Sequence, residues 1–271
     1  MKRQWTIPEA IAGVAIMGIS EIGLGMFLQP HAGAYYLNLG LLLLVHFAGF
    51  LGLWIFIRYY LHHPLSSVGL SFNNFGINCL EGFKWVFGAT CVVWLVNALL
   101  SVEWSADQFT ASQMPGYQAY VETQGILLAA FLFFFQAIWI SVWGSVAEEI
   151  AFRGLLYSAF RTKLSIRPAI LINAAIFMAA HGQVDAWAFA VGSLAAWLFE
   201  KHQSLIPAMV VHVALNFIRY LNQWFLGVMQ VNSQTYFWVG AGISGLISAA
   251  IILCLCGLQK SEGIFSRPLV R

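Results

Sequence analysis

Two adjacent carboxylates and an arginine interrupt an apolar part of the sequence, the run AEEIAFR that contains Glu148, Glu149 and Arg153. On a helix, Glu149 and Arg153 share a face, whereas Glu148 projects about 100° away from Glu149. Arg153 can therefore neutralise and hold Glu149, which leaves Glu148 free to hold a water molecule and take its proton as a general base. The alternative is a charge cluster near a helix end, with Glu149 and Arg153 as an ordinary helical pair.

Two further polar motifs follow in later apolar segments. His181 ends an otherwise apolar stretch, and a neutral imidazole there can orient the same water or accept its proton. His212 and Asn216 are four residues apart and share a helix face, so both can donate to one developing oxyanion in a dry site. The alternatives are a hydrogen-bonded packing histidine at 181 and hydrogen bonds between membrane helices at 212 and 216.

The composition places these motifs in a membrane protein. The chain of 271 residues is 60% hydrophobic and only 9% charged, whereas a soluble domain carries roughly 25% charged residues. The lipid bilayer is therefore the expected surrounding of the chain. The net charge of +2 is too small to indicate a nucleic-acid partner. None of the four cysteines shows the paired spacing of a zinc site, and no metal or other cofactor is expected.

A membrane-spanning helix needs about 20 apolar residues, which predicts an all-α, polytopic protein with about eight transmembrane helices. The predicted helices cover residues 7–28, 35–58, 80–102, 125–160, 168–182, 184–200, 205–226 and 235–257. The joint between the two short helices, residues 181–185, is polar. It is expected inside the bundle, because irregular backbone at membrane depth must be buried in protein or line a wet cavity.

Lysine and arginine gather in alternate connections between these helices. Arg161, Lys163 and Arg167 follow the fourth helix, whereas residues 103–124 contain neither type. The positive-inside rule then predicts that both termini are cytoplasmic. The expected location is the inner (plasma) membrane of the cell. The expected regions are the first three helices with their loop (1–124), a core that holds every motif (125–226), and a last helix with a cytoplasmic tail (227–271).

In this order, the EExxxR motif at 148–153, the FxxxH motif at 177–181 and the HxxxN motif at 212–216 resemble those of the intramembrane glutamic endopeptidases. This is the CPBP (or ABI) family, which includes the Rce1-type CAAX prenyl proteases. The SLIPA stretch at 204–208 is also similar to the family's pattern, and the resemblance covers roughly residues 125–220.

The resemblance implies a helix bundle with an intramembrane cavity that opens to the cytoplasm, and it implies peptide-bond hydrolysis. The implied roles are water activation by Glu148 and His181, support by Glu149 and Arg153, and an oxyanion site at His212 and Asn216. The expected substrate is a membrane-associated protein or peptide, cut near its C-terminus or in a membrane-proximal part. A prenylated CAAX protein, a sorting tail, a peptide pheromone and a lipoprotein-like precursor all remain open, as does the oligomeric state.

Three other interpretations use the same residues. In a zinc enzyme, the Glu-Glu pair and the two histidines would be ligands, but the His-Glu-x-x-His motif is missing and Arg153 would repel a cation. In a proton-coupled transporter they would form a relay, and Glu9, Glu21 and Glu81 keep that alternative open although no internal repeat is found. A non-catalytic membrane scaffold would not require all the motif residues.

Overall fold

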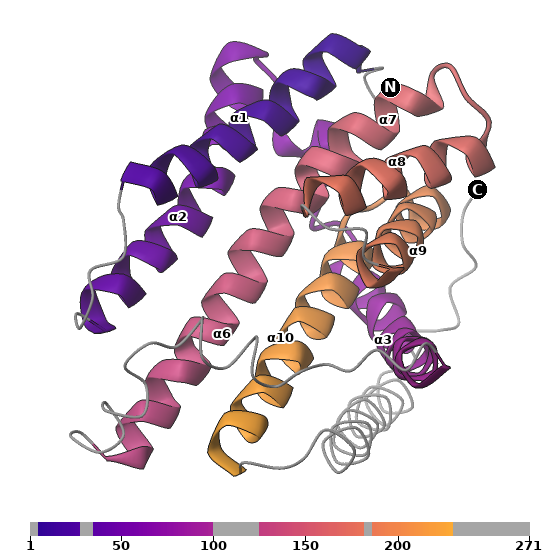
Figure 1. Cartoon of the computed structure of the whole chain (residues 1–271). Coiled ribbons are helices and arrows are strands. Elements are labelled where there is room, and N and C mark those ends of the chain that lie inside the picture. The colour runs from indigo at the N-terminus through magenta and orange to yellow at the C-terminus, as the bar shows by residue number, and fades with distance from the viewer. Residues whose placement is uncertain (1–4, 28–34, 100–124, 182–185, 230–271) are drawn as a thin grey trace.

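The computed structural model describes residues 5–27, 35–99, 125–181 and 186–229 (Figure 1). Within these ranges all regular structure is helical, which confirms the all-α prediction for this part of the chain. The helices are α1 (Ile7–Phe27), α2 (Tyr35–Ile55), η1 (Phe56–Tyr60), η2 (Leu65–Val68), α3 (Phe75–Leu99), α6 (Ile126–Glu148), η3 (Glu149–Tyr157), α7 (Ser158–Arg161), α8 (Ile166–Ala180), α9 (Ala186–His202) and α10 (Ile206–Met229). The predicted loop at 103–124 and the predicted eighth helix at 235–257 lie outside the described residues.

Among the described residues, three helical segments are long and apolar enough to cross a membrane, namely Ile7–Leu24, Leu43–Tyr60 and Phe131–Arg161. Large apolar side chains cover the outer faces of such helices, since Ile19 of α1 is 71% exposed and Leu127 of α6 is 85% exposed. These faces are unfavourable in water and favourable in lipid. The chain is therefore an integral membrane protein with several apolar helices.

The predicted helix boundaries agree with the observed ones to within a few residues, except around the second connection. Helix α3 begins at Phe75 and not at residue 80, because hydropathy marks only the apolar part of a helix and its first turns contain Asn78. Asn74, just before it, adopts a positive φ of 58°, which asparagine tolerates better than most residues. Helix α2 continues as the π-helix η1, so the chain stays helical to Tyr60.

The longest helix runs without a break from Ile126 to Arg161 and changes its winding where the Glu-Glu motif begins. Its middle part, η3, is a π-helix of nine residues that are all buried. Two side chains support the altered backbone: Asn173 Nδ2 donates to the Phe152 carbonyl at 2.8 Å, and Ser158 Oγ donates to the Arg153 carbonyl at 3.2 Å. π-Helical turns are rare and occur frequently at functional sites.

The other helices surround this long helix in a way that collects the motifs. Figure 1 shows α1 and α2 as an antiparallel pair on one side of α6, and α10 running beside α6 on the other. Helices α8 and α9 pack against each other and cover η3, which α1 also contacts. The three motifs lie on α6 with η3, at the end of α8 and on α10, so this packing brings them to one place.

Candidate active site

Glu149 and Arg153 form a fully buried ion pair in η3. Arg153 Nη1 lies 3.0 Å from Glu149 Oε1, and neither side chain is exposed. Arg153 Nη2 also donates to the Gly192 carbonyl of α9 at 3.2 Å, and the guanidinium lies 4.3 Å from the centre of the Phe177 ring. A buried charge needs a partner and hydrogen bonds, so these contacts fix Arg153 and, through it, the Glu149 carboxylate.

His212 of α10 connects the two carboxylates. Its Nδ1 lies 2.8 Å from Glu149 Oε1, and its Nε2 lies 3.6 Å from Glu148 Oε2. As the carboxylate of an ion pair with Arg153, Glu149 accepts this hydrogen bond, so His212 donates it from Nδ1. In the neutral imidazole Nε2 then faces Glu148 with a lone pair, and in the imidazolium it faces Glu148 with an N–H group.

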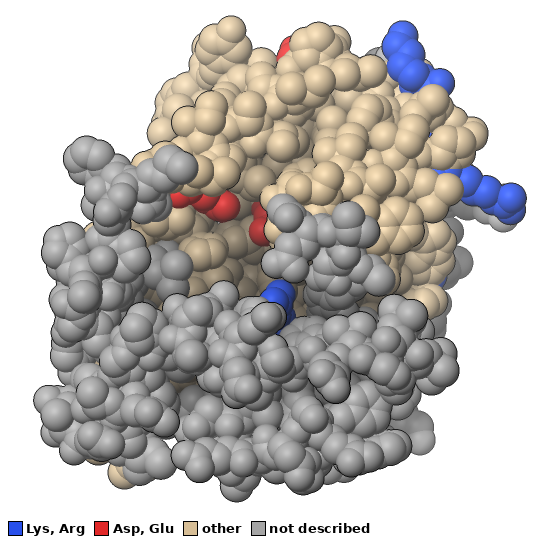
Figure 2. Space-filling view, viewed as in Figure 1, with Lys and Arg blue, Asp and Glu red and all other residues tan. Residues whose placement is uncertain are grey.

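His181 approaches Glu148 from the C-terminal end of α8. Its Nδ1 lies 2.8 Å from the Phe177 carbonyl, which can only accept, so Nδ1 is the donor and Nε2 of the neutral ring has the lone pair. That Nε2 lies 3.9 Å from Glu148 Oε2. The Glu148 side chain is partly exposed, and Figure 2 shows acidic side chains inside a hollow of the molecular surface. Glu148 is thus the more exposed carboxylate of the pair, although its Oε2 atom is buried.

Asn216 lies one turn beyond His212 and contacts α6 through a different residue. Its Nδ2 donates to Ser145 Oγ at 3.1 Å, and Ser145 precedes Glu149 by one helical turn. An amide nitrogen has two N–H groups, so one remains for another acceptor. The structure therefore joins Glu148, Glu149, Arg153, His181 and His212 in one cluster and places Asn216 beside it.

The cluster lies deep in the longest apolar segment. Glu148 precedes Arg161 by 13 residues. The segment Phe131–Arg161 has 31 residues, so Glu148 lies close to its middle. Ionisable side chains at such a depth are costly and usually functional.

Residues 130–218 match the family model described as type II CAAX prenyl endopeptidase, Rce1-like. This segment is similar to the Rce1-like family. It contains the whole cluster and all three motifs, which confirms the predicted family resemblance. The description of that family is that of an endopeptidase. No curated protein and no solved structure gives a significant match to the chain.

Three residues of the Rce1-like segment support the cluster without being predicted as site residues. Gly192 accepts a hydrogen bond from Arg153, Ser145 accepts one from Asn216, and Asn173 holds the π-helical backbone. Asn173 is the single strongly polar residue in an apolar run of α8, a signal that the sequence offers. Gly192 and Ser145 give no such signal, because small residues are common in membrane helices.

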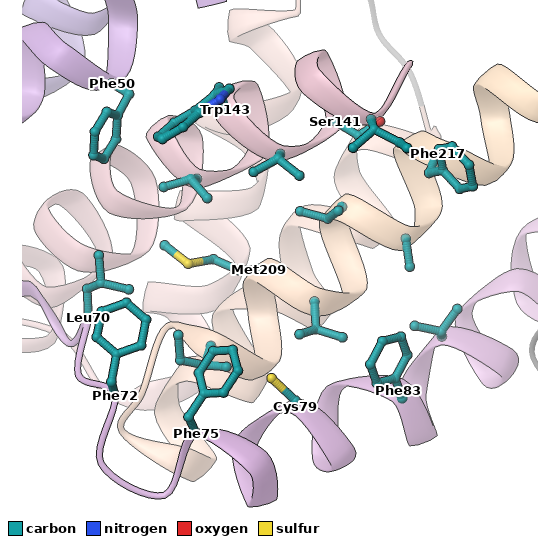
Figure 3. A pocket seen from close by; sticks show the side chains of 18 of the residues that line it. Phe50, Leu70, Phe72, Phe75, Cys79, Phe83, Ser141, Trp143, Met209 and Phe217 are labelled. Carbon is teal, nitrogen blue, oxygen red and sulfur yellow. The ribbon is translucent and has the colours of Figure 1, made fainter. Parts of the chain in front are cut away.

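A large apolar cavity adjoins the cluster. It has a volume of about 770 Å³ and is lined mainly by α3, α6 and α10 (Figure 3). Phe75 and Phe83 of α3 and Trp143 of α6 lie on opposite sides of it, with Met209 of α10 between them. Val213, which follows His212, also lines it. The cavity thus reaches a residue next in sequence to the cluster, although no residue of the cluster itself lines it.

The described residues offer no support for the interpretation as a zinc enzyme. There, no group of three or more His, Cys, Asp and Glu side chains is arranged to hold a metal ion. Glu149 is instead held by the Arg153 cation, and a neighbouring positive charge disfavours a second cation at the same carboxylate.

Proposed function

We propose that the chain is an intramembrane endopeptidase in which Glu148 and His181 activate a water molecule. The observation that supports this most is the unequal state of the two carboxylates. Glu149 is neutralised by Arg153, whereas Glu148 Oε2 has no hydrogen-bond partner among the described residues. That oxygen is 3.9 Å from His181 Nε2 and 3.6 Å from His212 Nε2.

These two separations suit a bridging water better than direct hydrogen bonds. A water oxygen can lie about 2.8 Å from both Glu148 Oε2 and His181 Nε2 when those atoms are 3.9 Å apart. The water would donate one proton to Glu148 as its oxygen attacks the substrate carbonyl carbon. Collapse of the tetrahedral intermediate breaks the C–N bond, and Glu148 returns the proton to the leaving nitrogen.

The oxyanion of that intermediate would be stabilised by His212 and Asn216. His212 can donate from Nε2 only when both ring nitrogens are protonated, because its Nδ1 proton is held by Glu149. Asn216 would contribute the N–H group that Ser145 does not accept. Preorganised donors of this kind are usually a major part of the catalysis of acyl transfer.

The substrate is proposed to be a membrane-associated protein or peptide, cut near its C-terminus or in a membrane-proximal part. The apolar cavity supports this, since it can bury a lipid chain or an apolar side-chain cluster next to the scissile bond. The depth of Glu148 supports it as well, because a soluble peptide would have no favourable contact there.

The direct test compares the membrane proteomes of cells that carry the native chain and cells that carry Glu148→Ala. We expect uncleaved precursors to accumulate in the variant, with extra residues at one end, and purified native protein to cleave them. Identical membrane proteomes, together with native turnover of any known substrate by Glu148→Ala, would contradict the proposal. A Gln203→Ala strain serves as the matched control, because that residue lies at the exposed connection between α9 and α10.

A further inference from the structure

Glu200 lies near the end of α9 and accepts three hydrogen bonds from the long helix beside it. Tyr157 Oη donates to Glu200 Oε2 at 2.8 Å. Arg161 donates to both carboxylate oxygens at 3.1 Å, from Nε to Oε2 and from Nη2 to Oε1. Arg161 Nη1 also donates to the Leu164 carbonyl at 2.6 Å. A bidentate arginine–carboxylate pair restricts the relative position of its partners, so this contact fixes α9 against the end of η3 and against α7.

The same long helix contacts α9 a second time, at the candidate active site. Arg153 Nη2 donates to the Gly192 carbonyl at 3.2 Å, and Gly192 precedes Glu200 by eight residues of α9, about two turns. Arg153, Tyr157 and Arg161 follow one another at intervals of four residues, and each of them donates to α9. The contacts at Gly192 and at Glu200 are therefore connected through one continuous helix.

Apolar packing alone would hold α9 less precisely. Ala188 and Ala196 of α9 are buried in the core cluster that also contains Phe152 of η3. The packing of such small apolar side chains is favourable but has no preferred direction. The hydrogen bonds to Glu200 depend on distance and angle, so a shift of α9 along or about its axis would break them.

The Gly192 carbonyl is important for the site because it orients Arg153. Arg153 Nη1 lies 3.0 Å from Glu149 Oε1, and the same oxygen lies 2.8 Å from His212 Nδ1. His212 Nε2 in turn lies 3.6 Å from Glu148 Oε2. A displacement of the guanidinium would therefore move the Glu149 carboxylate and the His212 ring that is bonded to it.

We propose that Glu200 is a positioning residue of the candidate active site, which fixes the register of α9 and thereby holds the Gly192 carbonyl at Arg153. Glu200 acts through Arg153 and His212 and does not itself contact the substrate. The expected effect on turnover rests on the proposed hydrolase function, whereas the expected effect on His212 does not.

Nuclear magnetic resonance of the full-length protein with isotope-labelled histidine, in lipid nanodiscs, tests this positioning. The ring nitrogens of His212 are assigned with His212→Gln and are measured well below the Tm of each variant. We expect Glu200→Ala to shift the Nδ1 resonance of His212, because the hydrogen bond from Nδ1 to Glu149 changes. Glu200→Gln keeps one oxygen as an acceptor, so it should shift the resonance less and in the same direction.

Lys201→Gln is the matched control, because it neutralises the next side chain of α9. Lys201 Nζ lies 5.1 Å from the centre of the Trp197 ring of the same helix. We expect this variant to keep the native His212 resonance.

A native His212 resonance in Glu200→Ala would overturn the proposal even if Tm falls, because Glu200 would then only stabilise the fold. Equal shifts in Glu200→Ala and Lys201→Gln would overturn it as well. If Glu200→Ala does not fold, Glu200→Gln and Tyr157→Phe replace it, since Tyr157→Phe removes a single hydroxyl. A native resonance in both of these variants would then overturn the proposal.

Turnover of an identified precursor gives a second measurement. A misplacement of about 1 Å in a catalytic site can cost about 10²-fold in rate, so we expect kcat of Glu200→Ala to fall by about 10-fold to 10²-fold. KM should stay native, because none of the described residues of α9 lines the apolar cavity. A higher KM with native kcat would contradict the positioning role. If the native protein cleaves no precursor, the proposed function fails, while the His212 resonance still tests the role of Glu200.

Discussion

At the scale of single residues, the buried ion pair is the most vulnerable contact of the candidate site. Arg153→Ala leaves the fully buried Glu149 carboxylate without its cation, so we expect the free energy of unfolding to fall by about 3–5 kcal/mol. Thermal unfolding in detergent would measure this as a lower Tm. Arg161→Ala is the comparison, because its two bonds to Glu200 and its bond to the Leu164 carbonyl are only partly buried and should cost less than the loss of the fully buried pair. Equal Tm values for the two variants would contradict the expectation.

Asn216 and its partner Ser145 offer a second test at this scale. Removing one oxyanion donor typically lowers turnover by about 10²–10³, and we expect this loss in kcat for Asn216→Ala on an identified precursor. Ser145→Ala keeps the Asn216 amide and removes only the hydroxyl that holds it at 3.1 Å. The loss in kcat for Ser145→Ala should therefore be much smaller than that for Asn216→Ala. A Ser145→Ala loss as large as that of Asn216→Ala would show that the pair acts only in packing.

At the scale of elements, the contact between α8 and α9 determines where His181 lies. A Cβ atom at Gly192 would be 3.2 Å from both Ala174 Cα and Phe177 Cδ1, so Gly192→Ala must push α8 away from α9. We expect a destabilisation of about 1–3 kcal/mol from overpacking, and lower turnover because His181 at the end of α8 moves from Glu148. Gly18→Ala is the matched control. It meets open space, and its higher helix propensity should leave Tm unchanged or slightly raised.

The sequence predicted the positions of the helices better than their winding and their contacts with one another. Hydropathy located the helices, and the i,i+4 spacing of Glu149 and Arg153 predicted their ion pair, because both depend on local geometry. The π-helix was not predictable, since an apolar pattern cannot distinguish i+4 from i+5 hydrogen bonding. The bond between His212 and Glu149 joins residues that are 63 positions apart, so it depends on how α10 packs against α6.

At the scale of the whole molecule, the charge distribution predicts which face of the membrane each connection occupies. Arg161, Lys163 and Arg167 follow the long helix, whereas residues 103–124 before it contain no lysine or arginine. Because positively charged connections stay in the cytoplasm, we expect the end of α7 to be cytoplasmic and the preceding connection to be external.

Labelling of single cysteines in the full-length chain in intact cells measures this orientation. With a membrane-impermeant maleimide, Ser112→Cys should react in intact cells, whereas Lys163→Cys should react only after the membrane is permeabilised. The four native cysteines occur in or beside apolar segments, and the unsubstituted chain gives their background. The reverse pattern would place the end of α7 on the outer face and would contradict the predicted orientation. The expected pattern limits the search for substrates to proteins whose cleavage site is reached from the cytoplasm.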